Sequence, residues 1–180
     1  NSGSYNLEIA PHSPCIDSGD PNGILDDDGS NTDIGAYYNY DINDYPFGLV
    51  DSLISELKIN ELLARNDSVN TDDFGEFDDW LELFNPTDQP LNLAGLYLTD
   101  DLSELTKWQF SDSMDVILPG DYLLIWCDED ISQGNQHSNF KLSANGETVV
   151  LTSGNGITII DSISYGTQIS NQSFGRIQDG

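Results

Sequence analysis

Acidic side chains gather in residues 70–79, a segment whose asparagine and glycine are typical of a turn. The carboxylates in this segment are those of Asp72, Asp73, Glu76, Asp78 and Asp79. Ca²⁺ binds about six to eight oxygen ligands, including carboxylates, and a cation would offset the mutual repulsion of these groups. The spacing does not match an EF-hand, because Phe74 and Leu81 would occupy ligand positions. The segment is therefore interpreted as either a calcium site or a solvated acidic loop.

A second acidic segment, residues 20–33, leaves the same two alternatives open. Its candidate ligands surround a glycine and are Asp26, Asp28, Asn31 and Asp33. The EF-hand pattern fails here too, because Ile24 and Gly35 would stand at ligand positions. Apolar residues nearby are too sparse for an independent core, so the segment needs another source of order. Calcium is the cofactor that both segments predict, with a solvated surface as the alternative.

Few residues offer catalytic chemistry. The sequence contains no GxSxG nucleophile motif, no HExxH zinc motif and no GxxxxGK[ST] phosphate loop. Its histidines are His12, near Cys15, and His137, which we predict to be an ordinary surface residue of a polar loop. Paired carboxylates of the kind used in glycoside hydrolysis are inevitable among 32 acids and carry no weight. We predict that the chain is not an enzyme.

The net charge restricts the partners. The 180 residues include 32 acidic and 5 basic residues, for a formal net charge of -27, and residues 1–57 contain no lysine or arginine. Such a surface repels nucleic acid phosphates and anionic lipid headgroups. No apolar run approaches the ~20 residues that a membrane span needs. We therefore predict no nucleic acid binding and no membrane insertion. The acidic surface is interpreted as an adaptation to a salty habitat, as a binder of divalent cations, or as both.

Short strand patterns separated by turns fill the last two thirds of the chain. The expected strands are residues 57–62, 80–84, 96–99, 107–110, 122–127, 148–152 and 157–163. Tyr122–Cys127 is the most apolar run and is the expected central strand. Asn145-Gly146 predicts a hairpin turn between residues 140–142 and 148–152. This spacing predicts an all-β, immunoglobulin-like β-sandwich over residues 57–180.

The same region resembles the lamin tail domain. The matching segments are INE at 59–61, GEFDDWLELFNPTDQPLNLAGLYL at 75–98, KWQF at 107–110, LPGDYLLIW at 118–126, FKLSANGETVVL at 140–151 and IDSISYG at 160–166. The resemblance implies an immunoglobulin-like fold that occurs in nuclear lamins and in many secreted bacterial proteins. The chromatin association of animal lamin tails is not carried over, because the acidic surface opposes it.

Residues 1–40 are dense in aspartate, glycine, serine and asparagine, which predicts a loop-rich extension. SPCIDSGDP at 13–21, DDDG at 26–29 and DIGAY at 33–37 resemble the C-terminal end of secreted right-handed parallel β-helix proteins. Such an end buries its apolar face on a preceding repeat, so the extension is expected to pack on an upstream domain, to pack on the sandwich or to stay loose. Residues 41–56 are the expected linker. Residues 49–57 are predicted to form an extended lead-in to the first strand, with one or two turns of helix as the alternative.

Cysteines and aromatic residues carry weaker signals. Cys15 and Cys127 are interpreted as either one bridge or two buried thiols. Most aromatic side chains of the sandwich are expected in the core, namely Trp80, Trp108, Trp126, Tyr97 and Tyr122. Trp80 or Tyr97 is the alternative candidate for an exposed platform that stacks on sugars.

Together these patterns favour a non-catalytic accessory or adhesion module of a secreted or cell-surface bacterial multidomain protein. Its expected partner is a protein, a glycan or a component of the cell envelope, and its expected location is extracellular or at the cell surface. One alternative is a carbohydrate-binding module, which predicts an exposed aromatic pair beside a calcium loop. The other is the C-terminal fragment of a β-helix polysaccharide lyase or hydrolase whose catalytic part lies upstream.

Overall fold

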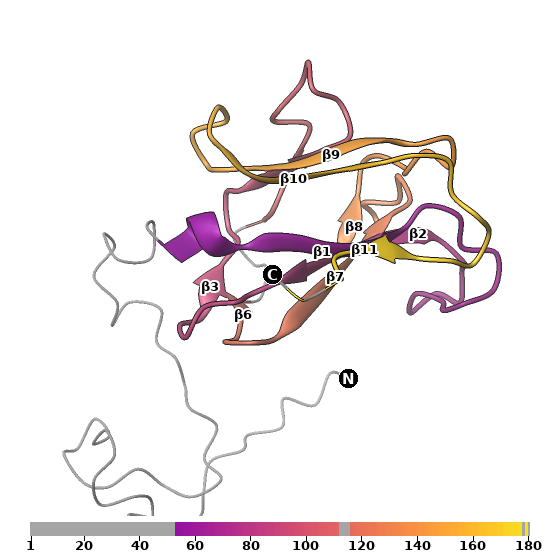
Figure 1. Cartoon of the computed structure of the whole chain (residues 1–180), viewed down its shortest axis with the longest axis horizontal. Helices are drawn as coiled ribbons and strands as arrows, with labels where there is room; N and C mark the ends of the chain where they lie inside the picture. Colours follow the sequence, from indigo (N-terminus) through magenta and orange to yellow (C-terminus); the bar gives the residue numbers. More distant parts are fainter. Residues whose placement is uncertain (1–52, 112–115, 178, 180) are drawn as a thin grey trace, which may run out of the picture. The chain divides into compact units, whose positions relative to one another are not determined.

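Short strands joined by turns make up the described part of the computed structural model, which is residues 53–111, 116–177 and 179 (Figure 1). One 3₁₀ turn, η1 (Ile54–Glu56), precedes the first strand. The strands are β1 (Lys58–Leu63), β2 (Asp79–Phe84), β3 (Leu91–Asn92), β4 (Tyr97–Thr99), β5 (Trp108–Gln109), β6 (Val116–Ile117), β7 (Tyr122–Cys127), β8 (His137–Ser138), β9 (Glu147–Thr152), β10 (Ile159–Tyr165) and β11 (Phe174–Gly175).

The strands form two main sheets. One sheet has the order β11-β1-β2-β7-β8, the other has the order β10-β9-β4-β5, and β3 and β6 make a separate pair. Neighbouring strands of the first sheet are antiparallel except β7 and β8, which run parallel. In Figure 1 the layer that contains β9 and β10 lies over the layer that contains β1, β2 and β7. The prediction of an all-β, immunoglobulin-like sandwich is confirmed.

Strand β2 shows how the sequence pattern produces this packing. Side chains of a strand alternate between its two faces, and Leu81 and Leu83 are both fully buried. Asn85-Pro86 follows the strand, because proline cannot donate to a ladder hydrogen bond. β2 pairs with β1 on one side and β7 on the other, so it is the middle strand of the five. The predicted central strand, β7, is instead an interior strand between β2 and β8.

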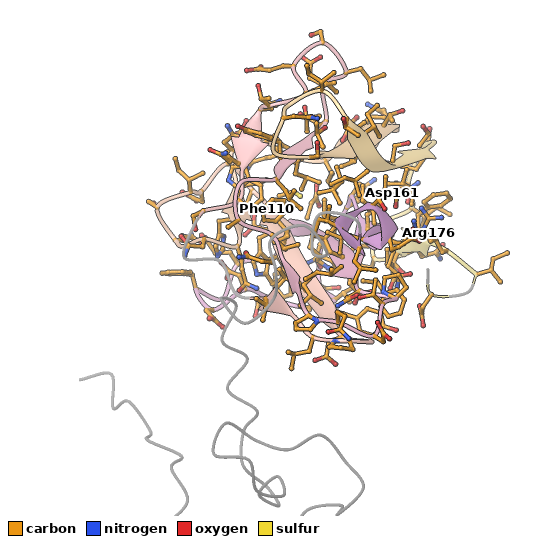
Figure 2. The ribbon with its side chains drawn as sticks, turned by 90° about the vertical axis from the view of Figure 1, so that its left-hand side faces the viewer. Phe110, Asp161 and Arg176 are labelled. Carbon is orange, nitrogen blue, oxygen red and sulfur yellow. The ribbon has the colours of Figure 1, made fainter. Side chains whose placement is uncertain are left out.

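The core draws side chains from both sheets. Phe110, labelled in Figure 2, is among its largest fully buried side chains. Its ring meets that of Trp108 edge-on with centroids 4.7 Å apart. Leu62 of β1 and Leu98 of β4 come from different sheets and neither has exposed area. Trp80 and Trp108 are both buried, which confirms their predicted core positions.

In the described part of residues 49–57 the extended lead-in is wrong, and the alternative of a helical turn is closer to the structure. Ile54–Glu56 form a 3₁₀ turn, and the Leu57 N–H donates to the Ile54 carbonyl oxygen at 3.2 Å. The turn places Leu53 and Ile54 against the core and leaves Leu57 fully buried. Burial of these apolar side chains on one side of the turn explains why the chain does not stay extended.

The turn at Asn145-Gly146 is present, but the hairpin predicted around it is not. The Gly146 N–H donates to the Ser143 carbonyl oxygen at 3.0 Å, and Gly146 has φ of 97°. A Cβ at this position would lie 2.6 Å from the carbonyl oxygen of Tyr165, so the turn requires glycine. β9 pairs with β4 and β10 rather than with residues 140–142, because that segment contributes its own side chains to the core.

Several sequence predictions fall outside the described residues. These are the loop-rich extension at 1–40 and the linker at 41–56 except its last four residues.

Candidate metal centre

The acidic loop between β1 and β2 closes on the side chain of Asp72. Its Oδ1 accepts hydrogen bonds from the backbone N–H groups of Phe74 at 2.9 Å and Glu76 at 2.8 Å. The Asp72 N–H donates to the Glu76 carbonyl oxygen at 3.1 Å, and the Gly75 N–H donates to the Asp72 carbonyl oxygen at 3.2 Å. Gly75 has φ of 84°, a left-handed conformation that glycine adopts without strain. Aspartate and glycine are thus the residues that this turn requires.

Asn66 holds both ends of the loop. Its Nδ2 donates to the carbonyl oxygen of Asn70 at 2.7 Å and to that of Asp78 at 2.8 Å. The Asn66 side chain is buried, and the Asn70 Oδ1 in turn accepts a hydrogen bond from Trp80 Nε1 at 2.8 Å. Buried amide hydrogen bonds therefore fix the loop to the sheet at both ends.

Three of the five carboxylates predicted in this loop converge. One carboxylate oxygen from each of Asp72, Glu76 and Asp78 lies within 4.8 Å of the other two. Asp72 is only 7% exposed, and its Oδ2 accepts no hydrogen bond from any described residue. A buried carboxylate oxygen without a donor is costly, and a cation can satisfy it. The cluster and its unpartnered oxygen together fit a cation that prefers oxygen ligands.

Burial and neighbouring negative charges raise the pKa of Asp78. Burial is the largest cause, and the negative charges of Asp128, Glu76 and Asp72 add to it. The positive charge of Lys141 acts in the opposite direction. A cation at the cluster would favour the ionised carboxylates and so lower this pKa again.

Asp73 and Asp79 lie outside the cluster. Asp73 is exposed, whereas Asp79 opens β2 and its Oδ1 accepts a hydrogen bond from the Asn66 N–H at 3.1 Å. Burial raises the pKa of Asp79 to about 6, although the hydrogen bond from the Asn66 N–H acts in the opposite direction. The predicted ligands of the other acidic segment are outside the described residues; they are Asp26, Asp28, Asn31 and Asp33.

Sequence reasoning missed Gln133, which reaches the cluster from the segment between β7 and β8. Its Nε2 donates to Glu76 Oε2 at 2.7 Å and lies 3.5 Å from Asp130 Oδ2. Its Oε1 is buried and has no hydrogen-bond partner among the described residues. A neutral glutamine gives no metal-binding signal in a sequence, and its place here depends on how β7 pairs with β2.

His137 lies in a buried pair with Asp128, so the prediction of a surface histidine is wrong. His137 is 6% exposed, and its Nδ1 lies 2.5 Å from Asp128 Oδ2. Asp128 Oδ1 also accepts a hydrogen bond from the Asp130 N–H at 2.8 Å. The Phe74 ring meets the His137 ring edge-on with centroids 6.2 Å apart. The physical reason is the parallel pairing of β8 with β7, which brings a short polar segment into the sheet.

The exposed aromatic residues near the cluster are two phenylalanines. Phe74 is 60% exposed and Phe77 is 50% exposed, and both belong to the acidic loop. The residues predicted as a sugar-stacking platform are less accessible, because Trp80 is buried and Tyr97 is half-buried. An exposed aromatic pair therefore lies beside the acidic cluster, but in residues that the prediction did not name.

Strand β7 carries one corrected aromatic position and a buried thiol. Tyr122, predicted in the core, is 46% exposed, and its hydroxyl donates to Asp179 Oδ2 at 2.8 Å. Its ring stacks on Phe84 with centroids 4.8 Å apart, so cross-strand pairing at the sheet surface replaces core burial. Trp126 is half-buried. Cys127 is buried, and burial raises the pKa of its thiol. Cys15 lies outside the described residues, so the bridge and the pair of buried thiols both stay predictions.

Comparison with known families decides what this sandwich is. A family model described as Lamin Tail Domain matches residues 52–167, well over half of the chain. The chain belongs to the lamin tail domain family. This family consists of immunoglobulin-like, non-catalytic domains, and the match includes the acidic loop and Gln133. No curated protein and no solved structure gave a match.

The lamin tail match begins at residue 52. The resemblance of residues 1–40 to a β-helix end lies outside it and stays a prediction. In the part of the lamin tail chain that the structure describes, no helix has the length and apolar character needed to cross a bilayer.

Proposed function

We propose that the chain is a non-catalytic accessory module of a secreted or cell-surface bacterial multidomain protein, and that calcium binds its acidic loop. The module would bind a protein, a glycan or an envelope component. The observation that carries the calcium part is the buried, unpartnered Oδ2 of Asp72 in a cluster with Glu76 and Asp78. An external location suits such a site, because extracellular modules operate where weak calcium sites are filled.

The ligand chemistry favours calcium over other divalent cations. The three clustered groups are carboxylates, which suit hard cations, whereas zinc prefers nitrogen and sulfur ligands. Calcium tolerates irregular geometry, while magnesium demands near-ideal octahedral coordination and keeps several waters. The three carboxylates come from one irregular loop. Such a loop satisfies the flexible coordination of calcium more readily than the octahedral coordination of magnesium.

Calorimetric titration with calcium, paired with melting curves in calcium and in chelator, tests this proposal. We expect binding, and a rise in melting temperature with calcium. A site with a Kd of about 10 µM would add about 2.7 kcal/mol to the free energy of unfolding at 1 mM calcium. In the double variant D72N/D78N, calcium should no longer bind to this loop. The part of the rise in melting temperature that comes from this site should disappear as well. Asparagine at 72 can still accept the two backbone hydrogen bonds through its Oδ1, so the turn should persist.

The matched control is D73N, which removes one exposed charge from the same loop outside the cluster. It should bind calcium within about twofold of the wild-type affinity. The other acidic segment is tested separately with D28N/D33N, so that two sites are not confused. Absence of calcium binding in the wild-type chain would contradict the proposal, as would unchanged binding in D72N/D78N.

Carbohydrate binding is a second candidate function, and the exposed Phe74 and Phe77 beside the cluster favour it. Aromatic rings offer an apolar face to the C–H surface of a sugar, and calcium can accept sugar hydroxyls as ligands. A panel of neutral polysaccharides should then bind in calcium and be released by chelator. F74A/F77A should weaken binding at least tenfold, whereas I157A, which truncates a still more exposed apolar residue in another turn, should not. Equal binding by both variants would reject this function.

A lyase or hydrolase fragment is the remaining alternative. It depends on sequence outside the lamin tail match, and a longer native polypeptide with repeated β-helix rungs would support it.

A further inference from the structure

Two loops leave the first sheet at the same end. The antiparallel register pairs Asp79, where β2 begins, with Cys127, where β7 ends. The loop before β2 and the segment after β7 are therefore neighbours, although they are far apart in the sequence. The segment after β7 turns back because the Gln133 N–H donates to the Asp130 carbonyl oxygen at 2.9 Å. It then enters β8, which runs parallel to β7.

The side chain of Gln133 spans the two loops. Its Nε2 donates to Glu76 Oε2 at 2.7 Å, which places the amide against one of the clustered carboxylates. The other half of the same amide, Oε1, is buried without a donor in the described structure. On the other loop, Asp72 Oδ2 is also buried without a hydrogen-bond donor in the described structure. Each loop thus contributes one unpartnered oxygen, and both residues that carry them are tied to Glu76: Asp72 through the carboxylate cluster and Gln133 through its hydrogen bond.

We propose that Gln133 supplies a neutral oxygen ligand to the cation held by Asp72, Glu76 and Asp78, so that the ion clamps the two loops together. This inference rests on the proposed calcium site. Three carboxylates bring enough negative charge for a divalent cation, and calcium also accepts amide carbonyl oxygens. An amide ligand completes more of the coordination sphere without adding a fourth repelling charge. The hydrogen bond from Nε2 to Glu76 keeps the amide next to the site.

The clamp also links two exposed apolar groups. Phe74 and Phe77 lie on the first loop, and Ile131, 61% exposed, lies on the second. With an ion between the loops, these side chains would hold fixed positions relative to one another.

Variants of Gln133 test the clamp by calorimetric calcium titration of the full chain. Q133A removes the oxygen and should weaken calcium binding about tenfold. Q133E keeps an oxygen and adds a charge, so it should bind calcium at least as tightly as the wild type. The matched control is Q136A, which truncates an exposed glutamine in the same segment and should leave the affinity unchanged. Melting curves in chelator check that each variant is folded.

The alternative role for Gln133 is only to position Glu76 by hydrogen bonding. In that case Q133E would weaken binding as well, because it loses the donor and repels Glu76, and this result overturns the proposal. Unchanged affinity in Q133A also overturns it. Either result leaves the proposed function standing if the wild-type chain binds calcium and D72N/D78N does not. A wild-type chain without calcium binding contradicts both.

Hydrogen exchange supplies a second readout. Calcium should slow amide exchange in residues 129–136 of the wild-type chain but not of Q133A, because only the wild type ties this segment to the ion. Equal slowing in both chains would show that the segment is ordered without the Gln133 ligand and would overturn the clamp.

Discussion

Asp72 combines two different tasks in one carboxylate. Oδ1 accepts the backbone N–H groups that close the turn, while Oδ2 is buried without a donor among the described residues. Asparagine can perform the first task, because its amide oxygen is also an acceptor, but its neutral oxygen attracts a cation much less. A single substitution at this position therefore separates the folding of the loop from its ion binding.

Glu82 of β2 predicts a pH dependence of stability. Burial raises its pKa above the ordinary value of 4.5, and the charges of Glu61 and Asp179 add to this, while the hydrogen bond from Asn60 opposes it. The folded chain therefore binds this proton more tightly than the unfolded chain, and stability is lost as the pH rises through the raised pKa. We expect E82Q to be more stable than the wild type at pH 7.5 and nearly equal at pH 4.

Urea denaturation at the two pH values measures this difference. Glutamine keeps an oxygen that accepts from Asn60 Nδ2, a bond of 2.9 Å in the wild type. E104Q, at an exposed position, is the control and should show no pH-dependent difference. A stability gain for E82Q that is as large at pH 4 as at pH 7.5 would disprove the electrostatic explanation.

Loss of the Phe110 side chain should destabilise the core strongly. Phe110 is 1% exposed, and its ring packs edge-on against Trp108. F110A should lower the free energy of unfolding by about 3–5 kcal/mol, because it removes a buried ring and leaves a cavity. I157A, at a 77% exposed position, should change it by less than about 0.5 kcal/mol. Denaturant titration compares them, and similar values would contradict the assigned core.

At the scale of elements, two β-bulges meet between the sheets. The register of β1 shifts between Ile59 and Glu61, and that of β10 shifts between Ile159 and Asp161. Asp161 bridges the gap, because its Oδ2 accepts the buried Ile59 N–H at 2.8 Å. Arg176, next to Asp161 in Figure 2, donates to the same carboxylate at 2.8 Å and to the Ile59 carbonyl oxygen at 3.0 Å. The bulges free backbone groups that these two side chains then satisfy.

Substitution of Asp161 should therefore destabilise the fold, and alanine should destabilise it more than asparagine. D161A leaves the Ile59 N–H without an acceptor and should lower the free energy of unfolding by about 1–3 kcal/mol. D161N keeps an oxygen for that N–H and loses only the charge opposite Arg176, so its loss should be smaller. Urea denaturation of both variants measures the difference. Equal losses would show that the ion pair, rather than the backbone hydrogen bond, carries the effect.

The sequence predicts elements where short-range patterns decide them. The alternation of Leu81 and Leu83 in β2 and the turn at 154–156 between β9 and β10 could both be read from neighbouring residues. Asp72, Glu76 and Asp78 could be named for the same reason, since they share one loop. His137 and Gln133 could not, because their surroundings arise from the parallel pairing of β8 with β7, which no local pattern encodes.

At the scale of the whole molecule, charge repulsion opposes folding. A net charge of -27 over 180 residues concentrates like charges when the chain becomes compact. Among the described residues, Lys107 forms an ion pair with Asp100 at 2.6 Å and Arg176 forms one with Asp161, but few cations are available for such pairs. Most of the surface charge must be balanced by dissolved ions.

Salt should therefore stabilise this chain. The Debye length falls from about 30 Å at 0.01 M salt to about 10 Å at 0.1 M, so repulsion between surface charges weakens as salt is added. Raising sodium chloride from 10 to 300 mM should therefore raise the melting temperature by several degrees. The measurement belongs in chelator, so that calcium does not contribute. Potassium chloride is the control for a specific sodium effect and should act alike. A melting temperature that falls with either salt would show that attraction between surface charges outweighs their repulsion.

The anchoring of the acidic loop by Asn66 makes this part of the chain suitable for protein engineering. The Asn66 side-chain amide donates to the carbonyl oxygens at both ends of the loop, on Asn70 and Asp78. These two hydrogen bonds attach the loop to the sheet without using any residue between 70 and 78. Residues 71–77 can then be treated as a replaceable insert. Grafting foreign metal-binding or peptide-recognition loops between Asn70 and Asp78 would use the lamin tail sandwich as a display scaffold, with a large net charge that favours solubility.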